Sequence, residues 1–530
     1  MKSKKLSQLI NLIIPAIVFG SVSGFFTAVV VVLYKFCGQK AVELMDSGYH
    51  ALTQHLYLLP VVLVVLFGVS ALLAFCYKKV PNINGGGIPT AIGILRGRIS
   101  FKWFRSLIGT FTASLLSFLL GIPLGTEGPS VLMGAAVGRG IMLPFKNHKA
   151  WDRYTMTGGA CGGFAVATGA PVAGIMFAVE EAHQRFSPMI FMVSGVSVAV
   201  AFVTTEVLGP LLGVDPRLFP KMELYDLGIR ELWIAAVVGV AFGLFAVAFL
   251  KFYRIISKLV SGKLSKVPHS VRIFLVCALT LIAGLLSLEF VSTGHHLMFE
   301  VMEGGFGILV LCSILIARSG LTVLANTNGI TGGIFIPIMA IGAVFAALVA
   351  KCALWLGLGE EYYLVMIVIG IAACIGSMMK MPLTAIIFSV EALSCYGNII
   401  HVVVAVALGY AITEIFAAKS INDIVLENRL DAMHAAAKSR VYDTFVTVRR
   451  DSFAVGKQIR DILWPANLFV LSVKYSTDST VVVDEHGGNG LRAGDVLHVR
   501  YSTYDEEETK RELTAIVGTQ DYVESEDSIV

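Results

Sequence analysis

The stretch GTEGP, at residues 125–129, decides the fold because it places a carboxylate at a glycine-rich break in an apolar part of the chain. Glycine permits backbone conformations that other residues avoid, and a proline such as Pro129 is well tolerated in the first turn of a helix. A helix that begins at such a break presents free N–H groups and the positive end of its dipole, which stabilise an anion. The stretch therefore predicts an anion site at a broken helix, with Glu127 beside it.

The composition around this stretch is that of a membrane protein. Of the 530 residues, 56% are hydrophobic and 15% are charged, whereas a soluble domain has roughly 45–50% apolar and about 25% charged residues. A helix needs about 20 apolar residues to cross a bilayer, and several of the apolar runs are shorter than that. These short runs predict helices that stop inside the membrane. The candidate spans are residues 9–34, 58–76, 103–120, 154–179, 189–208, 232–252, 271–288, 305–325, 334–356, 364–375 and 399–415.

The positive charges indicate topology. The basic start MKSKK precedes the first span, which predicts an uncleaved first helix whose N-terminus lies in the cytoplasm. Basic clusters at 96–105 and 146–153 are expected on the same side, more as topology signals than as a ligand patch. The net charge of +4 gives no support for nucleic-acid binding, and the 8 cysteines form no CxxC pair, so we expect no metal or redox site.

The composition changes near Lys419 and predicts four regions. Residues 1–425 form the transmembrane domain, 426–440 a linker, 441–518 a small α/β domain, and 519–530 an acidic tail. Within the α/β domain we expect strands at 442–448, 468–475, 480–483 and 495–501, and helices at 452–463 and 505–517. Because this domain follows the last span, it is expected in the cytoplasm.

The membrane part contains an internal repeat. GAPVAGIMFAVEEA (169–182) matches KMPLTAIIFSVEAL (380–393), so that Pro171 aligns with Pro382 and Glu180 with Glu391. Upstream, GTEGPSVLMGAAVG (125–138) has a looser partner in GITGGIFIPIMAIGAV (329–344). Duplicated halves with broken helices at matching places favour a transporter or channel whose site lies between the halves. The alternative is chance similarity between apolar segments.

Three glycine-rich breaks each lead into an apolar helical run: NGGGIP (84–89), GTEGP (125–129) and NGITGGIFIP (328–337). Together they predict a site that binds an anion through backbone N–H groups and not through a full positive charge. Such a site holds the ion weakly enough for it to leave. The alternative is that these glycines serve helix packing, which is the role we expect for GGACGG (158–163).

Carboxylates inside the membrane are functional candidates because they are costly there. Glu127 carries the same charge as the proposed substrate, so it can occupy the anion site when ionised and swing away when protonated. Its alternative role is to cap a helix. Glu180 and Glu181 end an apolar helix, either as a solvent-exposed helix end or as a proton entry point. His183 beside them is expected at the surface.

These segments resemble the CLC family of chloride channels and proton–chloride exchangers over about residues 10–425. GGGIP (85–89) is similar to that family's GSGIP, GTEGP to its GREGP or GKEGP, and GGIFIP (332–337) to its GGIFAP. GAPVAGIMFAVEE (169–181) is similar to the segment with the internal proton glutamate. The resemblance implies an all-α polytopic membrane protein with two inverted-repeat halves and broken helices, plus the small α/β domain, assembled as a homodimer with one pore per subunit.

The resemblance also implies roles for individual residues. Glu127 matches the external gating glutamate and Glu181 the internal proton glutamate, while Glu180 remains a possible helix-end acid. The anion contacts implied by position are the backbone amides of Ile334 and Phe335, with Gly86 where the family has a serine and Asn422 where it has a tyrosine. Both replacements remove a hydroxyl donor from the anion site, so they bear on selectivity and on coupling.

The segment VGKQIRDILWPANLFVLSVKY and the later LRAGDVLHVRY resemble the C-terminal RCK (TrkA-C-like) domain of prokaryotic ion transporters. The resemblance implies pairing across a two-fold axis and, in some relatives, a small regulator such as a cyclic dinucleotide in the cleft. The alternative is a stability and dimerisation module without a ligand.

The expected function is exchange of chloride for protons across the cell membrane, because both glutamates of a proton path are present. A passive gated chloride channel and a fluoride/proton antiporter remain alternatives, since Gly86 and Asn422 alter the site. A membrane enzyme or a receptor is the alternative from another class. We expect no enzyme and no cofactor, because no metal cluster or nucleophile–base pair accompanies the carboxylates.

Overall fold

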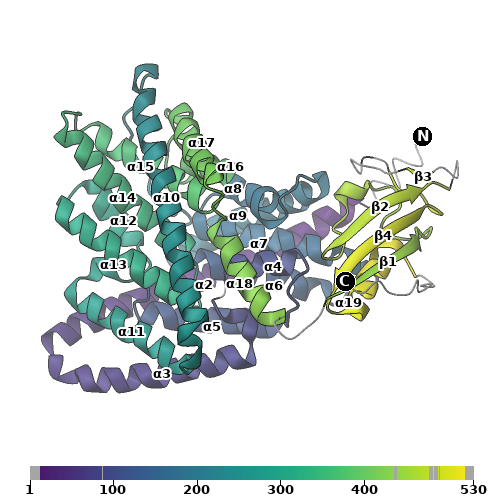
Figure 1. Cartoon of the computed structure of the whole chain (residues 1–530), viewed down its shortest axis with the longest axis horizontal. Coiled ribbons are helices and arrows are strands. Elements are labelled where there is room, and N and C mark those ends of the chain that lie inside the picture. Colours follow the sequence, from purple (N-terminus) through teal and green to yellow (C-terminus); the bar gives the residue numbers. More distant parts are fainter. Residues whose placement is uncertain are drawn as a thin grey trace.

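A computed structural model describes residues 12–85, 87–434, 439–476, 481–482, 488 and 490–519 of the chain. Helices dominate it, and a small antiparallel sheet lies at one end of its longest axis (Figure 1). The apolar runs thus form one packed helical body, and the β-branched segments near the C-terminus form the small α/β domain that the sequence predicts.

The first half of the helical body mixes long helices with short ones. Its elements are α2 (Ile14–Gln54), η2 (Leu56–Leu58), α3 (Leu59–Lys79), η3 (Pro81–Ile83), α4 (Ile88–Leu95), α5 (Trp103–Leu119), α6 (Glu127–Met142), η4 (Lys146–Trp151), α7 (Asp152–Thr168), α8 (Pro171–Phe177), the π-helical turn η5 (Ala178–Ala182) and α9 (Pro188–Leu212).

The second half has the same mixture. Its elements are η6 (Ile229–Glu231), α10 (Leu232–Ser261), η7 (Lys263–Lys266), α11 (His269–Leu286), η8 (Leu288–Phe290), α12 (His295–Glu303), α13 (Ile308–Thr327), α14 (Phe335–Trp355), α15 (Tyr362–Met378), α16 (Pro382–Glu391), α17 (Ile399–Ile415) and α18 (Ile421–His434).

Short helices confirm the prediction of broken helices. In the described part of the chain, 7 helices are long and apolar enough to cross a membrane, whereas α8 has 7 residues and α16 has 10. The single span expected at 154–179 is wrong. Gly169 adopts a φ of 69° and ends α7, and Pro171 then starts α8.

The repeated segments pack against each other and cap each other. The carboxylate of Glu180, after α8, accepts hydrogen bonds from the backbone N–H groups of Leu383 and Thr384 at the start of α16, at 2.9 and 2.8 Å. The carboxylate of Glu391, at the end of α16, accepts in the same way from two N–H groups in the first turn of α8, both at 2.9 Å. Each acid therefore satisfies the free N–H groups of the other helix. This reciprocity confirms that the two segments are structural repeats.

Glycines allow α6 and α7 to approach closely. A Cβ atom on Gly159 would lie 2.2 Å from the carbonyl oxygen of Gly134, and one on Gly163 would lie 2.3 Å from that of Ser130. No side chain fits at these distances, so the packing role expected for the segment 158–163 is confirmed.

The small domain is a four-stranded antiparallel sheet in the order β1-β4-β2-β3, with one helix. Its elements are β1 (Arg440–Thr447), η9 (Ile459–Asp461), β2 (Leu468–Lys474), β3 (Val481–Val482), β4 (Val496–Thr503) and α19 (Glu506–Val517). The expected strands and the expected helix at 505–517 are confirmed, and Asp505 caps α19 by accepting from the N–H of Glu508. Residues 520–530, most of the acidic tail, lie outside the described part.

The helix expected at 452–463 is wrong. Gly456 adopts a φ of 80°, which interrupts helical backbone. The N–H groups of Ala454 and Gly456 donate to the carbonyls of Ile516 and Leu491. These donors are therefore engaged with distant residues and do not form the hydrogen bonds of a helix. The segment is a series of turns that ends in η9.

Helix α18 continues beyond the boundary expected at residue 425. It packs against α4, and the guanidinium of Arg429 donates to the hydroxyl of Thr90. The first part of the expected linker at 426–440 is therefore helix, and residues 435–438 lie outside the described part.

Candidate anion and proton site

The second and third glycine-rich breaks meet face to face. Gly125 and Gly333 form an isolated antiparallel bridge with two N–H···O bonds of 2.6 and 2.8 Å. A Cβ atom on Gly128 would lie 2.7 Å from the Cα of Gly333 and 2.9 Å from the Cα of Gly87. Only glycine fits at this crossing, so backbone from all three breaks converges on one point.

The first break also joins the third directly. The N–H of Gly85 donates to the carbonyl of Gly329 at 2.6 Å, and both glycines have positive φ. Gly86, the residue expected to replace the family's serine at the anion, lies outside the described residues, so its contact stays a prediction.

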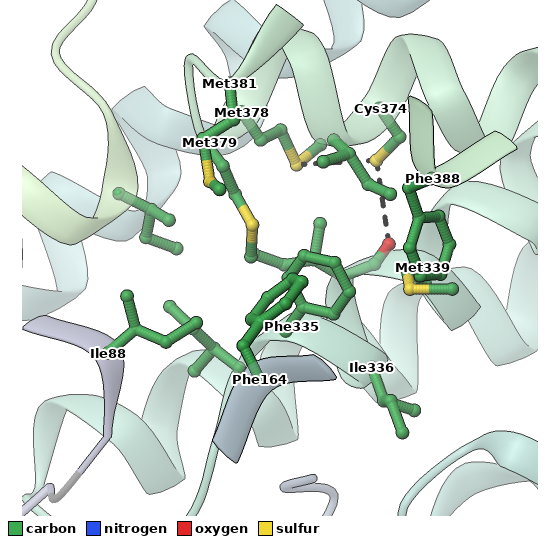
Figure 2. Close-up of a cluster of buried hydrophobic side chains, with 14 of the residues drawn as sticks. Ile88, Phe164, Phe335, Ile336, Met339, Cys374, Met378, Met379, Met381 and Phe388 are labelled. Atoms are coloured by element: carbon green, nitrogen blue, oxygen red, sulfur yellow. Dashed lines mark hydrogen bonds between the residues drawn. The ribbon is translucent and has the colours of Figure 1, made fainter. Parts of the chain in front are cut away.

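The helix that follows the third break is held by aromatic packing. Ile334 is the N-cap of α14, and Phe335 is its first residue, so their N–H groups belong to the unpaired start of the helix. The ring of Phe335 packs edge-on against Phe164 of α7, at 5.3 Å between centroids, and against Phe388 of α16, at 5.7 Å (Figure 2). Helices from both halves of the chain thus fix this helix start. The anion contact of its two amides stays a prediction.

Four methionines that the sequence did not single out lie in the same buried cluster. Figure 2 draws them around Phe335 and Phe388, and each is fully buried. They are Met339, Met378, Met379 and Met381. Thioether side chains are flexible and polarisable, so they can fill irregular space around the two phenylalanine rings.

Glu127 lies where the second break meets α14. Its side chain is fully buried, and Oε1 accepts a hydrogen bond from the hydroxyl of Thr126 at 2.8 Å. A Cβ atom on Gly125 would lie 2.7 Å from Oε2 of Glu127 and 3.1 Å from Cβ of Ile336. The carboxylate therefore sits beside the first turn of α14, and Oε2 has no hydrogen-bond partner among the described residues. The gating role expected for Glu127 stays a prediction.

Lys35 is a charged residue near Glu127 that the sequence did not predict. It lies on α2, and its ammonium donates to the carbonyls of Val166 and Asp215 at 3.3 and 3.0 Å. It is close enough to Glu127 for an electrostatic interaction. In the sequence it could have been recognised as a single cation at the end of the first apolar run, because a charge inside a membrane costs free energy.

Glu181 lies in the π-helical turn η5 and is nearly fully buried. Its Oε1 accepts a hydrogen bond from the side-chain amide of Asn422 at 3.0 Å. The guanidinium of Arg96 donates to the backbone carbonyls of Glu181 and Ala182 at 2.8 and 2.9 Å. Arg96 was expected as a topology signal, but it holds this turn. A single π-turn is often found at functional sites.

A cavity of about 390 Å³ opens beside this turn. Glu180 and Glu181 line it, together with Asp423, Lys380 and Arg185. Both carboxylates of the expected proton entry point therefore line one open cavity, and their role in proton entry stays a prediction.

The two neighbours of Glu181 have contacts that the sequence did not predict. The carboxylate of Glu180 caps the start of α16 by accepting hydrogen bonds there, so it is not a free helix end. His183, expected at the surface, is half-buried, and its Nε2 lies 2.8 Å from the hydroxyl of Thr157.

Comparison with solved structures shows the fold. A slow cyanobacterial Cl⁻/H⁺ antiporter matches with a TM-score of 0.70 and 24% identity, over 78% of this chain and 98% of that chain. A CLC-type fluoride/proton antiporter matches with a TM-score of 0.64 and 17% identity, over 76% and 96%. A eukaryotic CLC transporter matches with a TM-score of 0.63 and 17% identity, over 79% and 74%.

A family model reaches the same result from the sequence. The model described as "Voltage gated chloride channel" matches residues 67–414, which include all three breaks and both repeated segments but end before the α/β domain. Because this match covers more than half of the chain and the fold agrees, the protein belongs to the CLC family.

Proposed function

We propose that this protein exchanges chloride for protons across a membrane, with Glu127 as the external gate and Glu181 as the internal proton glutamate. One observation carries the proposal: each carboxylate is buried, Glu127 beside the start of α14 and Glu181 on the wall of an open cavity. The proposal assigns no enzymatic step to them.

The proposed anion binding rests on backbone N–H groups at helix starts. The starts of α4, α6 and α14 follow the converging glycine breaks, so their free N–H groups and dipoles favour an anion at this point. The proposed contacts are the amides of Ile334 and Phe335. Chloride is the proposed anion, because the most similar structure named above is a Cl⁻/H⁺ antiporter. Fluoride is the alternative, since another matched structure is a fluoride/proton antiporter.

The proposed proton coupling follows because an ionised Glu127 and the transported anion carry the same charge. An ionised Glu127 competes with an anion for the start of α14, because both are stabilised by the same N–H groups. Binding a proton removes that competition and frees the side chain to leave. Glu181 exchanges its proton with the cavity on the inner side. Anion entry is thereby coupled to proton uptake at Glu127.

A passive channel is the second candidate, and one observation favours it. Asn422 is short, and its amide is engaged with Glu181. A residue in this position leaves the inner side of the anion site without the bulk of a tyrosine. An inner opening without a barrier would allow anions to pass without protons.

The assembly and its location are part of the proposal. We place the protein in the cell membrane with both termini in the cytoplasm, because the basic clusters favour that side. Exposed apolar side chains on α8, α16 and α17 support pairing of two subunits through these helices; they include Val172, Leu383, Ile400 and Val403. We propose an RCK-type regulatory role for the α/β domain, with a cyclic dinucleotide as its ligand.

Proton pumping in liposomes tests the proposal. An outward chloride gradient should drive protons uphill in the wild type. Glu127→Gln should abolish proton movement and keep anion flux, and Glu181→Gln should do the same from the other end of the path. Lys40→Gln is the matched control, because its ion pair with Glu43 is exposed. Anion flux without protons in the wild type would establish the channel instead.

A further inference from the structure

Asn422 contacts the proton glutamate, although its sequence position implied an anion contact. Its amide nitrogen lies 3.0 Å from Oε1 of Glu181, and the exposed fractions of the two side chains are 1% and 3%. The residues are 241 positions apart in the sequence. A buried hydrogen bond to a carboxylate is among the stronger polar contacts in a protein.

Both partners of this bond are held in place. The start of α18 is fixed because the N–H of Asp423 donates to the hydroxyl of Ser420 at 3.0 Å. The turn η5 is fixed by Arg96, which also lies 3.9 Å from the Asp423 carboxylate. The distance between Asn422 and Glu181 is therefore set by rigid elements on both sides.

The amide of Asn422 has a second, unused group. Its Oδ1 is buried and has no hydrogen-bond partner among the residues that the structure describes. An asparagine amide carries donors and an acceptor, and a protonated carboxyl group carries one O–H donor. The same side chain can therefore donate to the ionised form of Glu181 and, after rotation, accept from its protonated form. No other uncharged side chain of this length offers both.

We propose that Asn422 is a positioning residue for Glu181, serving both of its protonation states, and is not a contact of the anion. The inference rests on the proposed function. Leucine at this position would match the size of asparagine and offer neither group. Loss of a hydrogen bond to a charged group changes an equilibrium constant by roughly tenfold or more. Proton exchange at Glu181 should slow by a comparable factor.

The test places Asn422→Leu in two backgrounds, the wild type and Glu127→Gln. In the wild type we expect proton-coupled exchange to fall roughly tenfold and its pH profile to change. In the Glu127→Gln background, where anions move without protons, we expect anion flux and the chloride-to-fluoride preference to stay unchanged. Asn428→Leu, on the exposed face of the same helix, is the control.

The outcomes separate the two roles of Asn422. A change of anion flux or preference in the Glu127→Gln background would make Asn422 an anion contact and overturn the inference. Unchanged coupling in the wild-type background would overturn it as well. If the unmodified protein moves no protons at all, the proposed function fails first, and that result is visible before any Asn422 variant is measured.

A separate observation concerns the junction between the helical body and the α/β domain. The hydroxyl of Tyr154 donates to the carbonyl of Asp461 at 2.7 Å and accepts from the N–H of Leu463 at 2.9 Å. The guanidinium of Arg153 donates to the carbonyl of Trp464 at 2.6 Å. Side chains of α7 thus bind the backbone of the segment 461–464, which runs from the last residue of η9 toward β2.

The same segment reaches the turn that carries Glu181. Arg185 follows Glu181 by four residues, lines the same cavity, and donates to the carbonyl of Ile462 at 2.9 Å. This bond engages the guanidinium of Arg185 with the junction segment. The ring of Phe453 packs against Tyr154 at 5.9 Å between centroids, which adds apolar contact to the junction.

We infer that the segment 461–464 transmits the state of the α/β domain to the turn η5. When the segment detaches, Arg185 is free to turn toward the carboxylates of the cavity, which keeps Glu181 ionised and slows exchange. Tyr154→Phe removes both hydrogen bonds of the hydroxyl and keeps the ring. It should therefore raise the equilibrium constant for detachment of the segment 461–464 roughly tenfold. Tyr363→Phe, which removes a hydroxyl bond to the carbonyl of Val301, is the matched control.

Hydrogen–deuterium exchange on the full-length protein tests this coupling. In Tyr154→Phe we expect faster amide exchange in both 459–464 and 178–185, together with slower turnover at an unchanged proton-to-anion ratio. Faster exchange confined to 459–464, with normal turnover, would show that the junction is only structural and would overturn the inference. The exchange measurement does not depend on which ion is carried.

Discussion

Glu180→Gln should weaken the fold and leave proton coupling intact, although Glu180 is the direct neighbour of Glu181, the proposed proton glutamate. The carboxylate accepts three hydrogen bonds at the start of α16: from the N–H of Leu383 at 2.9 Å, and from the N–H and hydroxyl of Thr384 at 2.8 and 2.7 Å. Glutamine keeps one acceptor but turns an NH₂ group toward these donors. It also removes the negative charge from a helix N-terminus.

The magnitude follows from these contacts. Loss of a helix cap costs about 0.5–2 kcal/mol, and loss of the charge at the dipole costs about 0.3–1 kcal/mol. Part of the site is exposed, so we expect a total loss of about 1–3 kcal/mol for Glu180→Gln. Glu391→Gln, which removes two bonds of 2.9 Å from the start of α8, should cost somewhat less.

Thermal unfolding and liposome transport together test this prediction. Glu180→Gln should lower the Tm of the purified protein by a few degrees, while the proton-to-anion ratio stays that of the wild type. Glu181→Gln should give the opposite result, with a normal Tm and no proton movement. A Glu180→Gln protein with a normal Tm and lost proton coupling would refute the capping role.

Two further predictions concern packing and pH. Gly159→Ala should destabilise the protein by at least about 2–3 kcal/mol, because its Cβ would lie 2.2 Å from a carbonyl of α6; Gly48→Ala, with open space around it, should be nearly neutral in the same unfolding assay. Burial raises the pKa of Asp443, but hydrogen bonds from Arg500 and His498 outweigh it and hold that pKa below its usual value. Since the folded-state pKa is depressed, Asp443 stabilises the α/β domain above the unfolded-state pKa of about 3.9, and this is lost as the pH falls through the folded-state value. Asp443→Asn should therefore reduce hydrogen-exchange protection of β1 and β4 at pH 7, by at most about 1 kcal/mol for so exposed a pair, and have no effect at strongly acidic pH.

The sequence predicted features that depend on local chemistry. Glycine and proline at 125–129 and 328–337 determine where helices begin, so the breaks could be located without a structure. The repeat was visible because Pro171 and Pro382 start equivalent helices, and Glu180 and Glu391 follow them at the same spacing along the chain. The reciprocal capping explains why these positions agree: each acid must reach the start of the other helix.

The sequence did not predict features that depend on distant contacts. The bond between Asn422 and Glu181 exists only because α18 returns to η5. The helix expected at 452–463 failed because the carbonyls of Leu491 and Ile516 take the N–H groups that it needed. The role of Arg96 was hidden for the same reason, since its partners are backbone carbonyls that no side-chain pattern reveals.

The reversal potential of the wild type in planar bilayers tests coupled exchange most directly. With a fixed chloride gradient and a varied pH gradient, coupled exchange predicts a reversal potential between those of chloride and protons that moves with pH, and the position gives the stoichiometry. In Glu127→Gln it should return to the chloride value and no longer depend on pH. A wild-type reversal potential that equals the chloride value at every pH would contradict the account.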